Sequence, residues 1–160
     1  MAKVFMICGK ICSGKTTYAL KLRETEKACL LSVDALMLNS AKAEQNMCHD
    51  EQVMKIKNVL LERAERLIKE GESVVLDWGF WSKEERKAVK EYFMERSIDY
   101  ELHYINISDN LWDKRILKRN NSIIDEKTKA YFVDKGLKDK CIRTFEEPSE
   151  NEVDLMIWEE

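Results

Sequence analysis

Proline and glycine are scarce in this chain, which has one proline and five glycines among its 160 residues. Because these residues break helices and strands, their scarcity predicts long regular elements joined by short loops. No apolar stretch approaches the roughly 20 residues that a membrane-spanning helix needs. Only three residues precede the first apolar run, too few for a secretory signal. We therefore expect a cytoplasmic protein without a membrane partner.

The cysteines and histidines show no metal-binding or disulfide pattern. The five cysteines, an odd number, include no C-x-x-C pair, which disfavours a disulfide framework and a structural zinc site. The two histidines, His49 and His103, are isolated, and His103 falls within a predicted strand. A formal net charge of −3 disfavours nucleic acid as a partner, although a local basic groove would be compatible with it.

Apolar periodicity predicts alternating strands and helices. Helical spacing covers about residues 51–70, two segments that begin after Ser82 and at Ser108, and residues 125–145 with a break at Gly136. Short apolar runs predict five strands, at residues 3–8, 28–32, 73–77, 100–107 and 153–158. This alternation predicts one α/β domain over residues 1–160, a three-layer α/β/α sandwich around a five-stranded parallel sheet.

A complete phosphate-binding motif, G-x-x-x-x-G-K-T, spans residues 9–16. It follows the first apolar run and leads into a segment with helical spacing, the context that a P-loop NTPase requires. Lys15 is placed to reach the β- and γ-phosphates of a nucleoside triphosphate, and the Thr16 hydroxyl is placed to ligate magnesium. Cys12, near a helix N-terminus, is either a reactive thiol or a filler position. The predicted nucleotide-binding residues are Gly9, Cys12, Ser13, Gly14, Lys15, Thr16 and Thr17.

Two aspartates follow predicted strands. Asp34 comes just after the second strand, where a carboxylate can accept the proton of an acceptor hydroxyl as general base; the alternative is an N-cap for the next helix. Asp77 closes the third strand, where it is expected to hold magnesium together with Thr16; the alternative is a turn-forming role. Ligands of parallel sheets bind at the carboxyl ends of the strands, which favours the catalytic interpretation of both.

Two arginines lie four residues apart on the helix that follows the fourth strand. Arg115 and Arg119 can neutralise charge on a migrating phosphoryl group from a lid at about residues 115–127. The alternative is a solvated basic face, because Lys114 and Lys118 lie on the same helix.

An aromatic cluster and one arginine follow Asp77. Trp78, Phe80 and Trp81 either wall an acceptor pocket or pack beneath the adjacent helix. Arg86 either binds an anionic acceptor or occupies a surface position, and we expect the surface position.

With these motifs the chain resembles the small P-loop kinases grouped with bacteriophage polynucleotide 5′-kinase, zeta toxin and chloramphenicol phosphotransferase, often labelled AAA-family ATP-binding proteins. The resemblance covers nearly the whole chain. It implies that Asp34 activates the acceptor hydroxyl, that Arg119 belongs to the lid, and that residues 143–148 form part of the base pocket. It rests on residues 9–17, 31–34, 74–77, Arg86, residues 115–120 and residues 145–148.

Two departures from the polynucleotide kinases weaken a nucleic-acid acceptor. Those enzymes tend to carry a second lid arginine at the position of Ile123, and a Thr-Asn type of sequence where this chain has Trp78 and Gly79. We therefore predict a kinase that uses ATP and Mg²⁺ to phosphorylate a hydroxyl of a small molecule. The alternatives are a nucleotide or polynucleotide 5′-hydroxyl kinase and a nucleotide-dependent switch or ATPase without an acceptor. A monomer and a homodimer are both compatible with the sequence.

Overall fold

The computed structural model describes residues 1–40, 49–126 and 132–160. Its centre is a single sheet of five strands in the order β2-β3-β1-β4-β5, and every neighbouring pair is parallel. The predicted parallel sheet is therefore confirmed, with strand ends that differ by one or two residues. The strands are β1 Val4–Cys8, β2 Cys29–Ser32, β3 Val74–Gly79, β4 Tyr100–Ile107 and β5 Leu155–Glu159.

Six helices connect or follow these strands in the described residues: α1 Lys15–Glu26, α2 Val33–Ser40, α3 His49–Lys69, α4 Lys83–Met94, α5 Asp109–Ile124 and α6 Lys135–Thr144. Helices α4 and α5 begin where the sequence predicted, and a serine side chain caps each of them. The Ser82 Oγ accepts a hydrogen bond from the amide of Glu85 (3.0 Å), and the Ser108 Oγ accepts one from the amide of Leu111 (3.4 Å).

The helix predicted over residues 125–145 is wrong in its first part. Helix α5 continues to Ile124 and ends where Glu126 adopts a left-handed φ of 59°. Helix α6 begins only at Lys135, because Asp134 caps it through a 2.7 Å hydrogen bond from the amide of Leu137 to Oδ1. Gly136 thus lies in the first turn of α6, and residues 127–131 of the predicted helix lie outside the described residues.

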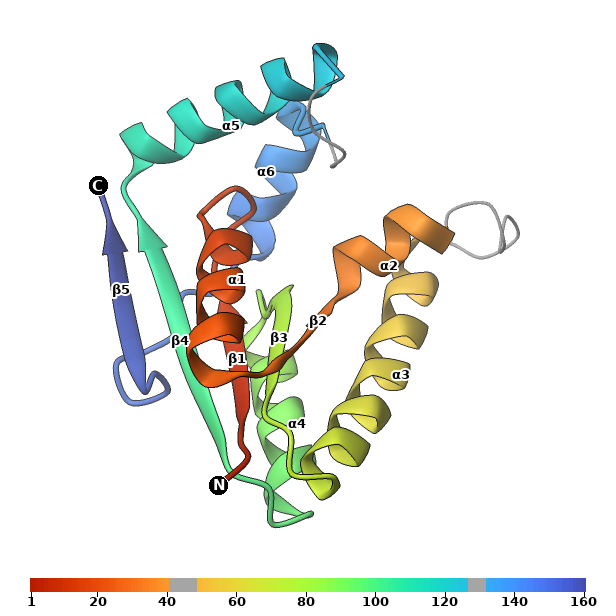
Figure 1. Cartoon of the computed structure of the whole chain (residues 1–160). Coiled ribbons are helices and arrows are strands. Elements are labelled where there is room, and N and C mark those ends of the chain that lie inside the picture. The colour runs from red at the N-terminus through yellow and green to blue at the C-terminus, as the bar shows by residue number, and fades with distance from the viewer. Residues whose placement is uncertain (41–48, 127–131) are drawn as a thin grey trace.

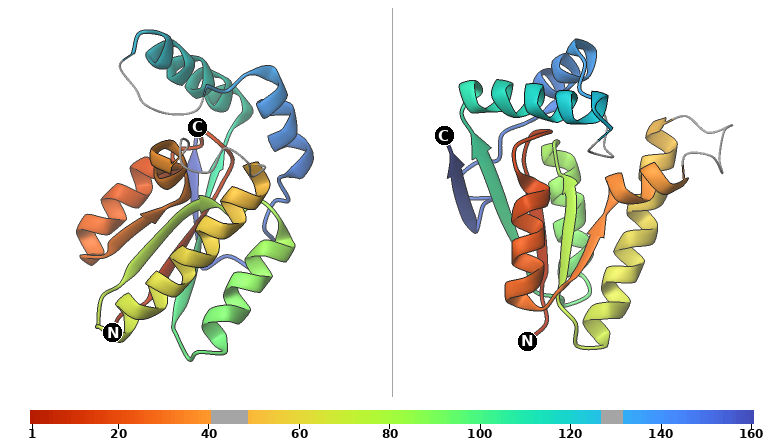
Figure 2. Two further views of the ribbon diagram at one scale, coloured as in Figure 1. Left: turned by 90° about the vertical axis from the view of Figure 1, so that its right-hand side faces the viewer. Right: turned by 45° about the horizontal axis from the view of Figure 1, so that its top comes forward.

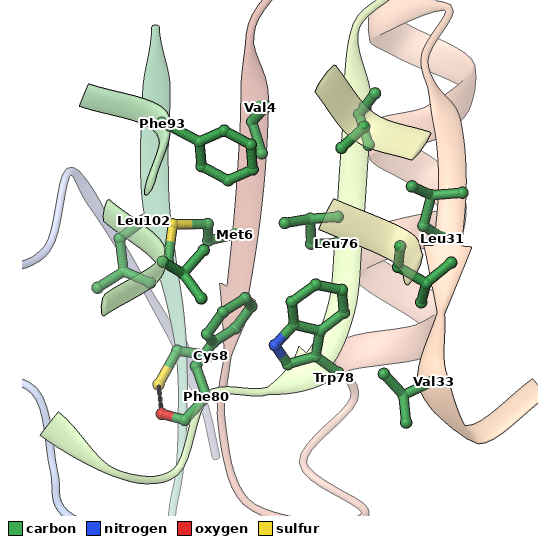
Figure 3. Packing of buried hydrophobic residues seen from close by; sticks show 14 of the residues in the cluster. Val4, Met6, Cys8, Leu31, Val33, Leu76, Trp78, Phe80, Phe93 and Leu102 are labelled. Atoms are coloured by element: carbon green, nitrogen blue, oxygen red, sulfur yellow. Dashed lines mark hydrogen bonds between the residues drawn. The ribbon is translucent and has the colours of Figure 1, made fainter. Parts of the chain in front are cut away.

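Strand β1 shows how the sheet supports two apolar layers. Successive side chains of a strand point to opposite faces. Val4, Met6 and Cys8 pack against helices α3 and α4, as Figure 3 shows from close by, whereas Phe5 and Ile7 pack against α1. These two clusters make the three-layer α/β/α arrangement that the sequence predicted.

Helix α5 lies across the carboxyl ends of the strands, and α6 runs from beside α5 down towards α4 (Figures 1 and 2). They enclose a third apolar cluster that includes Trp112, Ile116 and Cys141. Because parallel strands all end at this edge, the phosphate loop, the end of β3 and helix α5 meet there. No helix in the three described ranges is long and apolar enough to cross a membrane.

The surface position expected for Arg86 is wrong, because this side chain is only 1% exposed. Its Nε donates a hydrogen bond to Glu152 (3.1 Å to Oε1), and its Nη1 donates to the carbonyls of Phe80 (2.9 Å) and Trp81 (3.2 Å). Burial acts to raise the pKa of Glu152, but hydrogen bonds from the Ser149 amide and Arg86 leave that pKa below its ordinary value. Arg86 therefore ties α4 to the turn after β3.

We expect Arg86→Ala to lower the free energy of unfolding by about 3–5 kcal/mol, because it breaks a buried ion pair and leaves the Glu152 carboxylate without its charged partner. The measurement is urea denaturation followed by circular dichroism. The matched control is Arg63→Ala, an exposed arginine on α3, which should change stability by less than about 0.5 kcal/mol. A loss no larger than that of the control would show that the buried guanidinium is not needed for the fold.

Candidate active site

The phosphate loop joins the end of β1 to the start of α1. Gly14 has a φ of 102°, which a residue with a side chain adopts only under strain. At Gly9 a Cβ would lie 2.7 Å from the Ser13 Oγ and 3.1 Å from the Ile105 carbonyl. Helix α1 has no side-chain cap, so the first N–H groups of the helix stay available to an anion. These features fit a phosphate-binding cradle.

Two predicted nucleotide-binding residues interact with neighbouring groups of the site. The Lys15 ammonium donates a hydrogen bond to the Lys10 carbonyl at 2.7 Å, within the loop. Cys12 has a left-handed φ of 58°, and its Sγ accepts a hydrogen bond from the Arg119 Nη1 at 3.2 Å. The buried Ser13 Oγ has no partner among the described residues. This unpaired hydroxyl also fits a loop that binds a polar ligand.

The two predicted metal ligands are in contact. The Thr16 Oγ1 donates a 3.0 Å hydrogen bond to the Asp77 Oδ2, and Asp77 is only 4% exposed. Burial raises the pKa of Asp77, and the charge of Asp34 adds to this, while Lys15 and Thr16 oppose it. A hydroxyl and a carboxylate are suitable ligands for Mg²⁺, which keeps several ligands from water or phosphate. The described residues hold no cluster of three or more His, Cys, Asp and Glu side chains that would bind a metal alone.

Asp34 lies in the first turn of α2 and is exposed to the same cavity as Asp77. The alternative N-cap role belongs to another residue, because the Ser32 Oγ accepts the hydrogen bond from the amide of Ala35 (3.3 Å). The Asp34 carboxylate therefore does not cap α2, and its charge raises the pKa of Asp77.

The two arginines of α5 point at the phosphate loop. The Arg115 guanidinium donates to the Ser13 carbonyl (2.6 Å) and to the Glu159 Oε2 (3.2 Å). The Arg119 Nε is buried and has no hydrogen-bond partner in the described part of the chain. The alternative interpretation, a solvated basic face, is therefore wrong for Arg115 and Arg119. Lys114 and Lys118 on the same helix are exposed. Position 127, the end of the predicted lid, lies outside the described residues.

A cavity of about 990 Å³ joins the loop, both aspartates and both arginines. Trp78 and Trp81 line it, whereas Phe80 is fully buried against Trp78 with ring centroids 5.0 Å apart. Trp78 therefore contacts both the cavity and the core, Trp81 lines the cavity, and Phe80 packs in the core.

The base pocket implied for residues 143–148 is not part of this cavity. Phe145 packs instead against Tyr104, with ring centroids 6.1 Å apart. The cavity walls that sequence reasoning missed include Tyr18 on α1 and Ile157 and Glu159 on β5. The two β5 residues lie at the carboxyl end of a strand, so the rule that identified Asp34 and Asp77 could have found them.

We expect Asp77→Asn to raise the thermal midpoint at pH 7 without divalent cations. Because the folded chain raises the pKa of Asp77, the charged carboxylate costs stability once the pH exceeds the ordinary carboxyl pKa. The gain should shrink as the pH falls through the raised pKa of the folded state and disappear below about 4, where the carboxyl group is protonated in both states. Thermal unfolding in chelator across this pH range is the measurement. Asp99→Asn, at an exposed position, is the control, and a less stable Asp77→Asn protein at pH 7 would contradict the assignment.

Comparison with solved structures finds the same fold in kinases. A gluconokinase from Sinorhizobium meliloti 1021 superposes with a TM-score of 0.68 at 16% identity, over 98% of this chain and 82% of that chain. The Mycobacterium tuberculosis APS kinase, in complex with AMPPNP and APS, gives 0.69 at 16% identity, over 98% and 88%. A chain of the Pnkp1/Rnl/Hen1 RNA repair complex gives 0.70 at 18% identity, over 89% of this chain and 43% of that one.

At these identities the likeness concerns the fold. A search of curated proteins finds no match to the sequence. The profile of a protein family described as an AAA domain matches residues 4–148, which include the phosphate loop, both aspartates and both arginines. The chain therefore belongs to this AAA-domain family and has the fold of the small P-loop kinases.

Proposed function

We propose that the protein is an ATP-dependent, Mg²⁺-requiring kinase that transfers the γ-phosphoryl group of ATP to a hydroxyl of a small molecule. One observation carries the proposal: the Thr16–Asp77 hydrogen bond lies at the end of the phosphate loop, in one cavity with Asp34, Arg115 and Arg119. Phosphoryl transfer needs a phosphate cradle, a group that accepts the proton of the attacking hydroxyl, and positive charge on the migrating group. The cavity contains a candidate for each.

The roles follow from the chemistry of each side chain. Lys15 and the loop amides hold the phosphates, and Thr16 and Asp77 hold the metal ion. Bound Mg²⁺ would neutralise charge on the phosphates. Asp34 orients the acceptor hydroxyl and takes its proton. Arg119, together with Arg115, stabilises negative charge on the migrating group and helps to exclude water, which would otherwise compete as acceptor.

The acceptor side of the cavity favours a compact, uncharged or weakly charged alcohol. Its described walls include Asp34, Asp50, Val53 and the indoles Trp78 and Trp81. Carboxylates repel an anionic acceptor, and indoles suit a flat or sugar-like one. Lys140 also lines the cavity, 3.9 Å from the Asp50 carboxylate, so its charge is partly compensated. Arg86, considered above as a residue that binds an anionic acceptor, is buried and does not line the cavity.

A polynucleotide 5′-hydroxyl kinase is the second candidate, because a chain of an RNA repair complex has the same fold. The net charge of −3 and the absence of an arginine at position 123 weigh against it. The deciding experiment offers labelled ATP with a panel of hydroxylated metabolites, antibiotics, nucleosides and 5′-hydroxyl oligonucleotides. Label recovered on a small molecule supports the proposal, and label on the oligonucleotide supports the second candidate. Hydrolysis that no acceptor stimulates would indicate a nucleotide-dependent switch or ATPase.

We expect Lys15→Ala to abolish phosphoryl transfer, because the loop amides alone cannot neutralise the β- and γ-phosphates. Transfer of label from ATP to the best acceptor of the panel is the measurement. Lys87→Ala, on the exposed surface of α4, should transfer at the wild-type rate. Transfer by Lys15→Ala at a rate similar to wild type would place the phosphates elsewhere.

We expect Asp34→Asn to lower kcat by about 10²- to 10⁴-fold while the dissociation constant for ATP stays unchanged. The amide keeps the size of the side chain but cannot take up the proton of the acceptor hydroxyl. Steady-state kinetics and calorimetric titration with ATP separate the two effects. Wild-type kcat in this variant would show that Asp34 is not the base.

A further inference from the structure

The outward-facing carbonyls of the phosphate loop are held by side chains from other elements. A loop that points its N–H groups inward at a phosphate must turn its carbonyl groups outward, where each needs a donor. The Ser13 carbonyl receives one from Arg115, as described above. Two further carbonyls, those of Gly9 and Ile11, receive theirs from indole N–H groups.

Trp112 provides the shorter of these two bonds. It lies on α5, is 3% exposed, and its Nε1 donates to the Ile11 carbonyl at 2.6 Å. Its ring packs with Ile116 and Cys141 in the cluster below α5, and the Lys10 ammonium lies 4.7 Å from the ring centroid on the outside. Packing therefore fixes the indole ring, and the fixed ring holds its N–H group against the loop carbonyl.

Trp81, in the turn after β3, provides the second bond. Its Nε1 donates to the Gly9 carbonyl at 3.2 Å, and the Gly9 amide donates to the Gly79 carbonyl at 3.0 Å. The turn that carries Trp81 is itself held, because Arg86 donates to the Trp81 carbonyl and the amide of Glu146 donates to the same oxygen at 2.8 Å.

We propose that Trp112 and Trp81 are positioning residues that pre-organise the phosphate loop for a nucleoside triphosphate through their indole N–H groups. The proposal rests on the proposed function in that the loop is the nucleotide-binding element. Neither indole needs to touch the nucleotide. An indole N–H donates only and does not titrate, so this support is the same across the physiological pH range. Without it, the loop carbonyls can rotate inward and oppose a phosphate.

The test compares wild type with Trp112→Phe, which keeps an aromatic ring in the cluster but removes the donor to the Ile11 carbonyl. Calorimetry with Mg²⁺ and a non-hydrolysable ATP analogue should give a dissociation constant about tenfold higher, the effect of one buried hydrogen bond. Hydrogen exchange of the nucleotide-free protein should be faster in the peptide that covers residues 9–15, and unchanged in β4. A general loss of stability would not accelerate exchange in the loop alone.

The matched control is Ile116→Val, which loosens the same cluster on the same helix but has no bond to the loop. Its dissociation constant should stay within about twofold of wild type, because it removes packing and no donor. If Trp112→Phe does not fold, Trp81→Phe tests the same proposal, with faster exchange expected at the start of the loop.

The outcomes separate this inference from the proposed function. Wild-type affinity and wild-type loop exchange in the folded variant would overturn the inference, as would equal changes in Ile116→Val. A wild-type protein that binds no nucleotide would refute the proposed function. In that case exchange in the nucleotide-free loop would still decide whether the indoles hold it.

Discussion

The parallel pairing of β1 with β3 is the constraint on which the site depends. It sets Ile7 opposite Asp77 and Cys8 opposite Gly79, so the phosphate loop begins beside the acid that closes β3. The loop then returns through α1, which brings the Thr16 hydroxyl to within 3.0 Å of the Asp77 carboxylate. A buried carboxylate is costly unless charge and hydrogen bonds compensate it. Here Lys15 and Thr16 compensate in part, and a metal ion at the site would compensate further.

Side chains from two parts of the chain hold the phosphate loop: the turn after β3 and helix α5. On the β3 side, the turn through Gly79 and Phe80 has left-handed backbone at both residues, and the buried Arg86 holds it from below. Helix α5 lies across the sheet edge and contacts the loop through polar groups of Trp112, Arg115 and Arg119 and through an apolar cluster that includes Ile11 and Ile116. These contacts hold carbonyls of the loop, and both arginines line the same cavity as Lys15. The proposed phosphoryl transfer would need both features, because positioning and charge contribute most of its catalysis.

The cavity is acidic on the side where the acceptor is proposed to bind. Asp34 and Asp77 lie close enough for the charge of Asp34 to raise the pKa of Asp77, so two carboxylates stand together at this end of the cavity. Indoles on the same side exclude water and offer flat apolar surface. The carboxylates and indoles of these walls are the reason why we propose a small alcohol as acceptor rather than the phosphate backbone of a nucleic acid.

By itself the sequence determined the five strands, the phosphate loop, and the placement of Asp34 and Asp77 at strand ends, because these depend on local patterns and on one rule of parallel sheets. Only the tertiary structure decided the burial of Arg86, since its partner Glu152 is 66 residues away and no local pattern indicates it. The same holds for the Ser32 side chain, which caps α2 in place of Asp34, for the end of α5 at Ile124, and for the β5 residues that wall the cavity. Each depends on which groups meet after the chain has folded, and that information is not contained in the periodicity of any one segment.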